Sequence, residues 1–414
     1  MVKRLLCMGI MFLSSWAHSV DWGVEISSGL EYTSNAFLDE NASVSGLERN
    51  ISLATDVNHQ GTRSSAVGNY QMTRNYYPES FITDMTVQGG AKLSVDILPR
   101  NVSWNTSHVR TDTLRDFNDN DTPENRVIRQ DFQTGPLLSM RLTPLDTVQS
   151  SATRSWKTTE SDSSLDSETD SVSINYNRLI NSKTDLVLSV SSSDVSFELA
   201  QGYETQSETI TLNRQIKDGK LSLQIGSNKV SQVLMTTRSP TVNLSISKTL
   251  FQANVSLSYR KLLTHTSVDF SELGLNTPFF GVSGFTEVIE KEIFRFSLSR
   301  RVADAVDVNV SAYSDTSNSE TSNITSDRKG LTAQLGYSRP LSSFSSANVN
   351  YTFNYLDDGT NDNSTVQYVS LGYKRSISRK LSLSSGVDYS VRSGSIANDY
   401  SRSGVSAQLT YLLR

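Results

Sequence analysis

The chain has 414 residues, of which 36% are hydrophobic and 20% are charged, and its formal net charge is −5. The negative mean hydropathy excludes transmembrane helices, and the acidic balance excludes a basic surface for nucleic acid. A single cysteine, Cys7, excludes a disulfide framework.

The first 19 residues are typical of a secretory signal. Two basic residues precede an apolar run over 5–13, and the small residues Ala17 and Ser19 lie at positions −3 and −1 of a cleavage site. The run is too short to persist as a membrane-spanning helix. We therefore expect a signal peptide over 1–19 and a mature region over 20–414. The mature region shows no linker and no change of composition, and we expect no plug before its first strand.

Apolar and polar side chains alternate along the whole mature region with a period of two, which predicts β-strands with two different faces. Trp22, Val24 and Ile26 begin the first such segment. Twenty segments recur, each about 10 to 12 residues long, the length of a tilted strand that crosses a bilayer. We expect strands at 22–34, 47–59, 63–75, 83–97, 101–112, 129–142, 146–157, 169–178, 185–197, 207–217, 219–230, 241–248, 251–260, 285–300, 304–314, 328–339, 345–356, 365–376, 380–392 and 402–413.

The connections alternate in length. Short turns such as "LPRN", "TPLD" and "KDG" alternate with long loops such as "RDFNDNDTPEN" and "KTTESDSSLDSETD". This rhythm predicts an all-β fold: a single transmembrane antiparallel up-and-down β-barrel of the bacterial outer-membrane type, with about 20 strands, or 18. An even strand number leaves both termini at the short-turn rim, in the periplasm. A soluble multi-sandwich protein would need domain breaks, and a β-solenoid a fixed repeat length.

Aromatic and basic residues recur just before the short turns, on the apolar parity. We predict that they anchor the barrel at the periplasmic interface, where rings and cations meet lipid head groups. They are Tyr176, Arg178, Lys248, Arg300, Tyr337, Arg339, Tyr373 and Arg375.

The long loops are rich in carboxylates, which are either solvated or bridged to lipopolysaccharide by divalent cations. The segment "DFNDNDTPENRV" fails as a calcium loop, because Asp121 replaces the glycine and Val127 the bidentate glutamate that such loops require. The sequence shows no catalytic set, metal pair or phosphate loop. We therefore expect a non-enzyme without cofactors, in contact with outer-membrane lipid and lipopolysaccharide and with no nucleic acid.

Twenty strands enclose a cylinder about 40 Å across, too wide for side chains to fill. Its inner parity is mostly Ser, Thr, Asn and Gln. The lumen-facing charges that we predict are Lys92, Asp96, Arg141, Lys291, Arg295, Lys374 and Asp388. The apolar loop over 262–284 is predicted to enter the lumen as a constriction, since exposed it would form a costly patch. Its apolar residues are Phe270, Leu273, Leu275, Phe279 and Phe280.

Two stretches, "GVEISSGLEYTSNAFLDE" and "GPLLSMRLTPLDTVQSSATRSW", resemble the outer-membrane β-barrel porin family associated with exopolysaccharide operons. The resemblance implies a channel that lets a secreted polysaccharide cross the outer membrane, beside a separate periplasmic export protein. Two alternatives stay open. One is a general or oligosaccharide-uptake diffusion porin, and the other is a sealed structural or adhesive barrel.

Overall fold

A computed structural model describes residues 20–34, 45–77, 82–114, 126–160, 166–198, 201–233, 235–265, 288–319, 325–357, 363–394 and 399–413. The predicted signal peptide, 1–19, lies outside these residues. The described part contains the expected strands: β1 (Val20–Thr33), β2 (Gly46–Gln60), β3 (Ser64–Tyr77), β4 (Ile82–Leu98), β5 (Val102–Leu114), β6 (Arg126–Arg141), β7 (Asp146–Thr159), β8 (Ser167–Asn181), β9 (Thr184–Phe197), β10 (Tyr203–Ile216), β11 (Gly219–Ser231), β12 (Thr236–Leu250), β13 (Ala253–His265), β14 (Val288–Ala303), β15 (Val306–Ser319), β16 (Thr325–Ser342), β17 (Ser345–Asp357), β18 (Asn363–Ser376), β19 (Leu381–Gly394) and β20 (Tyr400–Leu413).

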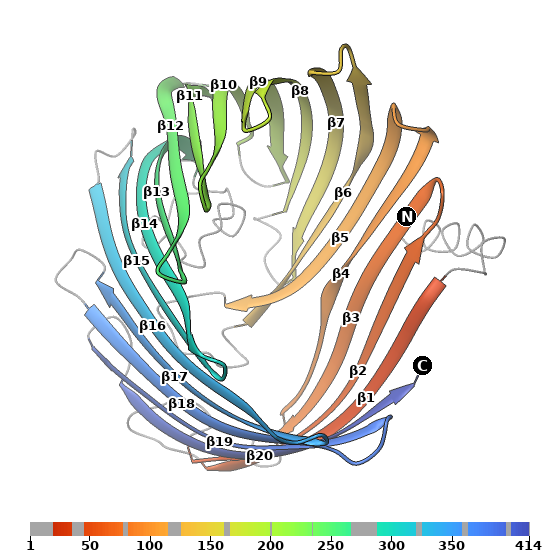
Figure 1. The fold of residues 1–414 in the computed structure, drawn as a ribbon, viewed down its shortest axis with the longest axis vertical. Coiled ribbons are helices and arrows are strands. Elements are labelled where there is room, and N and C mark those ends of the chain that lie inside the picture. The colour runs from red at the N-terminus through yellow and green to blue at the C-terminus, as the bar shows by residue number, and fades with distance from the viewer. Residues whose placement is uncertain are drawn as a thin grey trace.

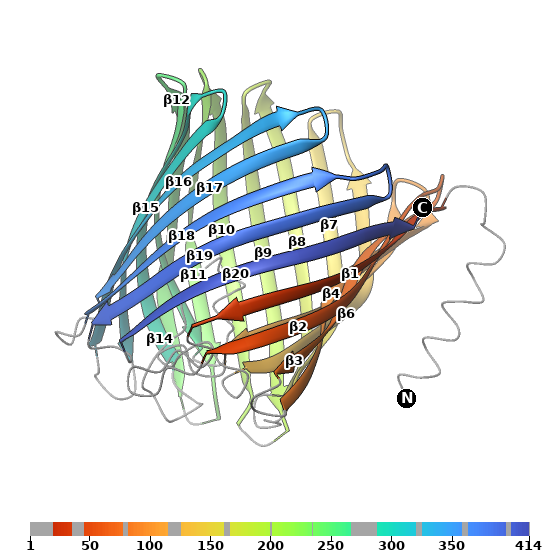
Figure 2. The same ribbon diagram turned by 90° about the horizontal axis from the view of Figure 1, so that it is seen from below.

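The strands form one closed antiparallel barrel (Figure 1). Each strand pairs with the next in the chain, and β1 pairs with β20, from Val24 opposite Leu413 to Thr33 opposite Gly404. Closure pairs the first and last strands with each other and so leaves no free edge strand, as a sheet in lipid requires. The start of β1 and the end of β20 lie at the rim that carries the short turns (Figure 2). One of these, between β12 and β13, places Phe251 and Gln252 at φ values of 51° and 65°, as a two-residue hairpin turn requires.

The two faces of the wall differ as the alternation predicts. On β1, Trp22 and Ile26 point outward and are 56% and 43% exposed, whereas Ser27 points inward and is buried. The same parity holds around the ring, so the large apolar side chains lie mostly outside and the hydroxyls and amides inside. A water-soluble protein would bury the apolar side chains, and this distribution therefore needs lipid outside. None of the described residues forms a helix long and apolar enough to cross a membrane.

Charged side chains on the outer face mark the two limits of the apolar belt, the band of outward-facing apolar residues around the barrel. On β16, Lys329 and Arg339 share the outward parity and are ten residues apart. A tilted strand covers about 25 Å over that length, close to the apolar band of outer-membrane barrels. The outward residues between them are Leu331, Ala333, Leu335 and Tyr337.

Two strand starts were predicted four and five residues too late. β10 begins at Tyr203, whereas we expected residue 207, and β12 begins at Thr236, whereas we expected residue 241. β12 contains Pro240, a residue that a strand paired on both sides excludes because it lacks the N–H donor. Here Pro240 is opposite Ser227 of β11, but β13 pairs with β12 only from Val242 onward. The proline is tolerated because this end of β12 lacks a partner on that side among the described residues.

Candidate functional site

The inner wall is a surface of small hydroxyl and amide side chains that bond to one another across neighbouring strands. Ser27 and Ser52 are joined at 2.5 Å, and Ser193 and Thr205 at 2.6 Å. Similar pairs occur between Ser151 and Ser173 and between Ser256 and Ser297. These short side chains keep the wall wettable and leave the lumen wide.

The seven charges assigned to the lumen from the sequence all fall on the inner parity of their strands, but in different settings. Lys92 and Lys374 are exposed, and Asp388 lies opposite Gly404. Arg141 bends to the short-turn rim, where its Nη2 donates to the Pro144 carbonyl at 2.8 Å. These four lie apart from one another.

The other three predicted charges differ from one another in exposure. Asp96 follows Lys92 on the inner parity of β4 and is half-buried. Lys291 and Arg295 come together on β14, and Lys291 is fully buried rather than open to the channel. Lys291 and Arg295 also interact electrostatically with each other.

The end of β13 leaves the wall and lies inside the barrel. β12 and β13 stop pairing at Val242 opposite Lys261, although both strands continue. Beyond that point β13 approaches β11 instead, where the inward-facing Asn228 donates from Nδ2 to the Leu263 carbonyl at 2.6 Å. This bond places the β13 end, with the β14 start beside it, over the inner face of β11 and β12.

An apolar cluster holds this end in place. Leu263 and Val288, each 1% exposed, pack with inward-facing residues of β9, β10 and β11. Burial of these apolar side chains against the wall stabilises the inward position, by about 25 cal/mol for each Å² of apolar surface that is removed from water. The wall residues of the cluster are Val195, Tyr203 and Val230, with Phe197 and Met235 packed against them.

An ion-pair network lies beside the apolar cluster. Lys261 donates to Glu290 at 2.6 Å and to Glu292 at 2.8 Å. The hydroxyl of Ser239, buried on the inner face of β12, donates to the other oxygen of Glu290, and the Tyr259 hydroxyl donates to Glu292. Lys261, Glu290 and Glu292 have the parity that faces lipid nearer the short-turn ends of β13 and β14. Their charge is accommodated because, at this end of the two strands, that parity faces the protein.

The predicted constriction residues Phe270, Leu273, Leu275, Phe279 and Phe280 lie outside the described residues. What the structure describes is the two strand ends between which this loop runs, Leu262–Thr264 and Val288–Ile289. Both ends are buried and lie on the lumen side of β11 and β12.

The predicted interface anchors lie on the outward parity near the short-turn rim, each within a few residues of the end of its strand. Tyr176 donates to Asp146 at 2.6 Å, and Arg178 approaches the same carboxylate at 3.9 Å. The others are Lys248, Arg300, Tyr337, Arg339, Tyr373 and Arg375. Their placement suits contacts with head groups and gives no contact with the lumen.

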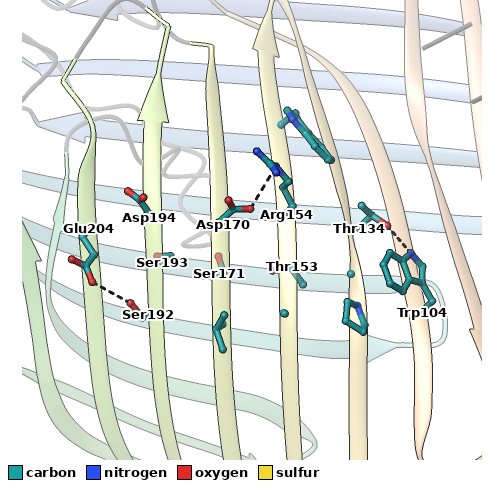
Figure 3. A pocket seen from close by; sticks show the side chains of 15 residues that line it. Trp104, Thr134, Thr153, Arg154, Asp170, Ser171, Ser192, Ser193, Asp194 and Glu204 are labelled. Atoms are coloured by element: carbon teal, nitrogen blue, oxygen red, sulfur yellow. Dashed lines mark hydrogen bonds and ion pairs between the residues drawn. The ribbon is translucent and has the colours of Figure 1, made fainter. Parts of the chain in front are cut away.

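A shallow pocket of about 650 Å³ lies on the outer surface of β5–β10 (Figure 3). Trp104 donates from Nε1 to Thr134 at 2.8 Å, and Arg154 pairs with Asp170 at 3.6 Å. The register places these side chains on the outward parity, the same parity as Val172 of β8. The pocket therefore does not belong to the channel, and its charges mark where the apolar belt ends on this side.

Three inner-wall residues near Lys291 were missed by the sequence analysis: Arg260, Tyr313 and Arg328. All three have the inner parity of their strands, so counting parity further along each strand would have found them. Within the described part of the chain, no group of three or more His, Cys, Asp or Glu side chains is placed to hold a metal ion.

No protein-family model matches the chain, and no curated protein matches it by sequence. Solved structures match its shape. The FrpB iron transporter of Neisseria meningitidis has a TM-score of 0.53 at 10% identity, over 95% of this chain and 81% of that one. The siderophore receptor PirA of Acinetobacter baumannii has a TM-score of 0.54 at 9% identity, over 95% and 80%. OccK1 of Pseudomonas aeruginosa has a TM-score of 0.43 at 12% identity, over 95% of this chain and 99% of that one.

The likenesses to FrpB and PirA, with the closed sheet itself, define the class of the fold. The chain is a closed antiparallel barrel of the bacterial outer-membrane type, as the sequence predicted. The two of these matches with TM-scores above 0.5 are structures of an iron transporter and of a siderophore receptor.

Proposed function

We propose that the chain is an outer-membrane channel through which a secreted polysaccharide leaves the cell, with a separate periplasmic export protein at the short-turn rim. The observation that carries the proposal is the inner wall, where hydroxyl and amide side chains line the inside of a backbone cylinder about 40 Å across. A hydrated glycan exchanges its hydrogen bonds with such a wall at little cost, whereas an apolar solute gains nothing there. The resemblance to barrels of exopolysaccharide operons supports the direction of transport.

The short-turn rim then lies in the periplasm with both termini, and the long loops lie outside the cell. This orientation follows the usual design of outer-membrane barrels, in which periplasmic turns are short. Lipopolysaccharide surrounds the loop side of the belt, where outward carboxylates such as Asp170 and Asp194 begin.

The first experiment tests for a channel. The purified mature chain, reconstituted in liposomes, should admit sugars in graded fashion, with swelling that slows as the oligosaccharide lengthens. Swelling that is absent even for a monosaccharide contradicts the channel and favours a sealed barrel.

The second experiment tests the direction. In polymer-producing cells, deletion of the gene should trap polymer in the periplasm, and the full chain should restore its release. Normal release with a defect in oligosaccharide uptake contradicts export and favours the uptake porin.

A further inference from the structure

The apolar belt is interrupted on the outer face of β5. The outward residues of this strand from 106 to 110 are Thr106, His108 and Arg110. They lie four to eight residues above the short-turn end of β5, a rise of about 10 to 20 Å on a tilted strand. At the same heights the outer face of β16 carries Leu335 and Tyr337. Polar groups at that depth are expensive in lipid, and a surface of this kind is expected to be covered by protein.

Outward positions on the neighbouring strands hold small residues. On β3 and β4 these are Gly68, Gly89 and Ala91, and on β6 and β7 they are Thr134 and Ala152. We call these five residues and the three on β5 the β5 patch. Small residues and hydroxyls are enriched where membrane-spanning proteins touch, because they let two backbones approach closely.

Hydrogen bonds hold the polar groups of the β5 patch in place. The Tyr70 hydroxyl and Nδ1 of His108 share a hydrogen bond of 2.5 Å. Arg110 donates from Nε to the Val87 carbonyl at 2.8 Å and pairs with Glu160 at 2.8 Å. A surface whose side chains are already fixed loses little conformational entropy when a partner covers it.

The β5 patch and its border are complementary to themselves. Ala152 lies in the shallow pocket on this face, and the ring of Trp104, 43% exposed, borders the same pocket (Figure 3). Arg154 pairs with Asp170 at 3.6 Å and with Glu168, yet the side chains of Arg154 and Asp170 remain 52% and 62% exposed. A copy rotated by 180° can therefore set its carboxylate against the guanidinium and its ring against the hollow, as a twofold contact requires.

We propose that the β5 patch is the contact surface for a second copy of this chain within the outer membrane. The proposal goes beyond the proposed function and does not depend on what passes through the lumen. A second copy carries its own patch at the same height in the bilayer and offers both signs of charge. The anionic head group of lipopolysaccharide fits the hollow less well, because three carboxylates line it: Asp170, Asp194 and Glu204.

Sedimentation equilibrium of the full mature chain, in a detergent matched to the buffer density, tests the contact. We expect the mass of two chains. Ala152→Trp fills the hollow and should weaken association about tenfold or more. Ala333→Trp, the same change on the outer face of β16, should leave the dimer intact. Both side chains point out of the wall, and folding of each variant is checked by its heat-modifiable migration on gels.

Energy transfer in lipid vesicles provides a second measurement. Leu145→Cys, in the short turn between β6 and β7, carries the labels, since the single cysteine of the chain lies in the predicted signal peptide. We expect transfer between copies to persist when the protein is diluted with lipid, and to be lost in the presence of Ala152→Trp. Such a result supports the contact even where detergent separates the copies.

Three outcomes overturn the proposal. A chain that weighs one copy in detergent and shows no transfer in vesicles contradicts it. Ala152→Trp that associates as tightly as the unchanged chain places the contact elsewhere and contradicts it as well. Lipopolysaccharide that copurifies with a monomeric chain and is lost from Ala152→Trp shows that the hollow takes lipid instead of a second copy. A dimer that shows no liposome swelling supports the contact and contradicts the channel, so the two failures are distinguishable.

Discussion

The two ends of β13 have the same alternation but different surroundings. Near the short turn, Val255 and Leu257 point outward from the barrel wall into the space of the lipid. Six residues after Leu257, Leu263 has the same parity but is buried against the inner face of β11. Period two therefore decides which residues share a face, and the path of the strand decides what covers that face.

The positions of three charged residues and of one proline agree with the departure of the β13 end from the wall. Lys261, Glu290 and Glu292 would lie on the lipid side if the strands continued in the wall, and charges there are expensive. Inside the barrel they pair with one another and with Ser239. Pro240 lies on the part of β12 that β13 has left.

The largest expected effect separates the two ends of β13 directly. Leu263→Ala should cost about 2–5 kcal/mol, because it empties a closed apolar cluster. Leu257→Ala, the same change on the same parity, should cost less than about 1 kcal/mol, because lipid tails fill the space. Urea unfolding in lipid vesicles measures both. Equal costs would contradict the inward position of Leu263.

The second prediction concerns a charge on the wall itself. Leu335→Arg places a cation in the middle of the belt on β16 and should cost about 2–4 kcal/mol. Gln334→Arg, its inward neighbour, should cost less than about 1 kcal/mol, because the new side chain reaches water. The same unfolding assay applies. A reversed order of the two would show that the faces are assigned wrongly.

The third prediction tests the ion-pair network of Lys261, Glu290 and Glu292, which is expected to be enclosed by protein at the end of β13. A double-mutant cycle with Lys261→Met and Glu290→Gln should give a coupling of about 1–2 kcal/mol, more than an exposed pair gives, since both side chains are about one-fifth exposed. A cycle on Arg301→Met and Asp307→Asn, an exposed pair, should give less than about 1 kcal/mol. A coupling near zero in the first cycle would contradict the enclosed position.

The smallest effect is expected at the short-turn rim, far from the end of β13. Arg339→Gln should cost about 0.5 kcal/mol or less, since the cation only extends to head groups. Arg379→Gln, in the turn beyond the membrane, should cost nothing measurable. The difference should shrink when anionic lipid is left out of the vesicles. A loss of several kcal/mol at Arg339 would point to a structural partner instead of lipid.

The sequence predicted the parts of the barrel that depend on local pattern. Alternation placed the strands and their faces, and the Tyr and Arg residues before the turns marked one rim. It did not predict the departure of β13, which depends on contacts between distant segments such as Asn228 with Leu263. One signal was available: Val195, Tyr203 and Val230 are apolar on the inner parity, and such residues in a wet lumen indicate that something covers them.

The most direct test of the inward strand end is a spin-label scan of β13 in vesicles, with oxygen and a water-soluble nickel complex as relaxers. We predict that labels at Val255, Leu257 and Tyr259 are accessible to oxygen, and that a label at Leu263 is immobilised and shielded from both relaxers. A label at Leu263 that is as accessible to oxygen as the one at Leu257 would place this end of β13 in the lipid-facing wall and contradict the account.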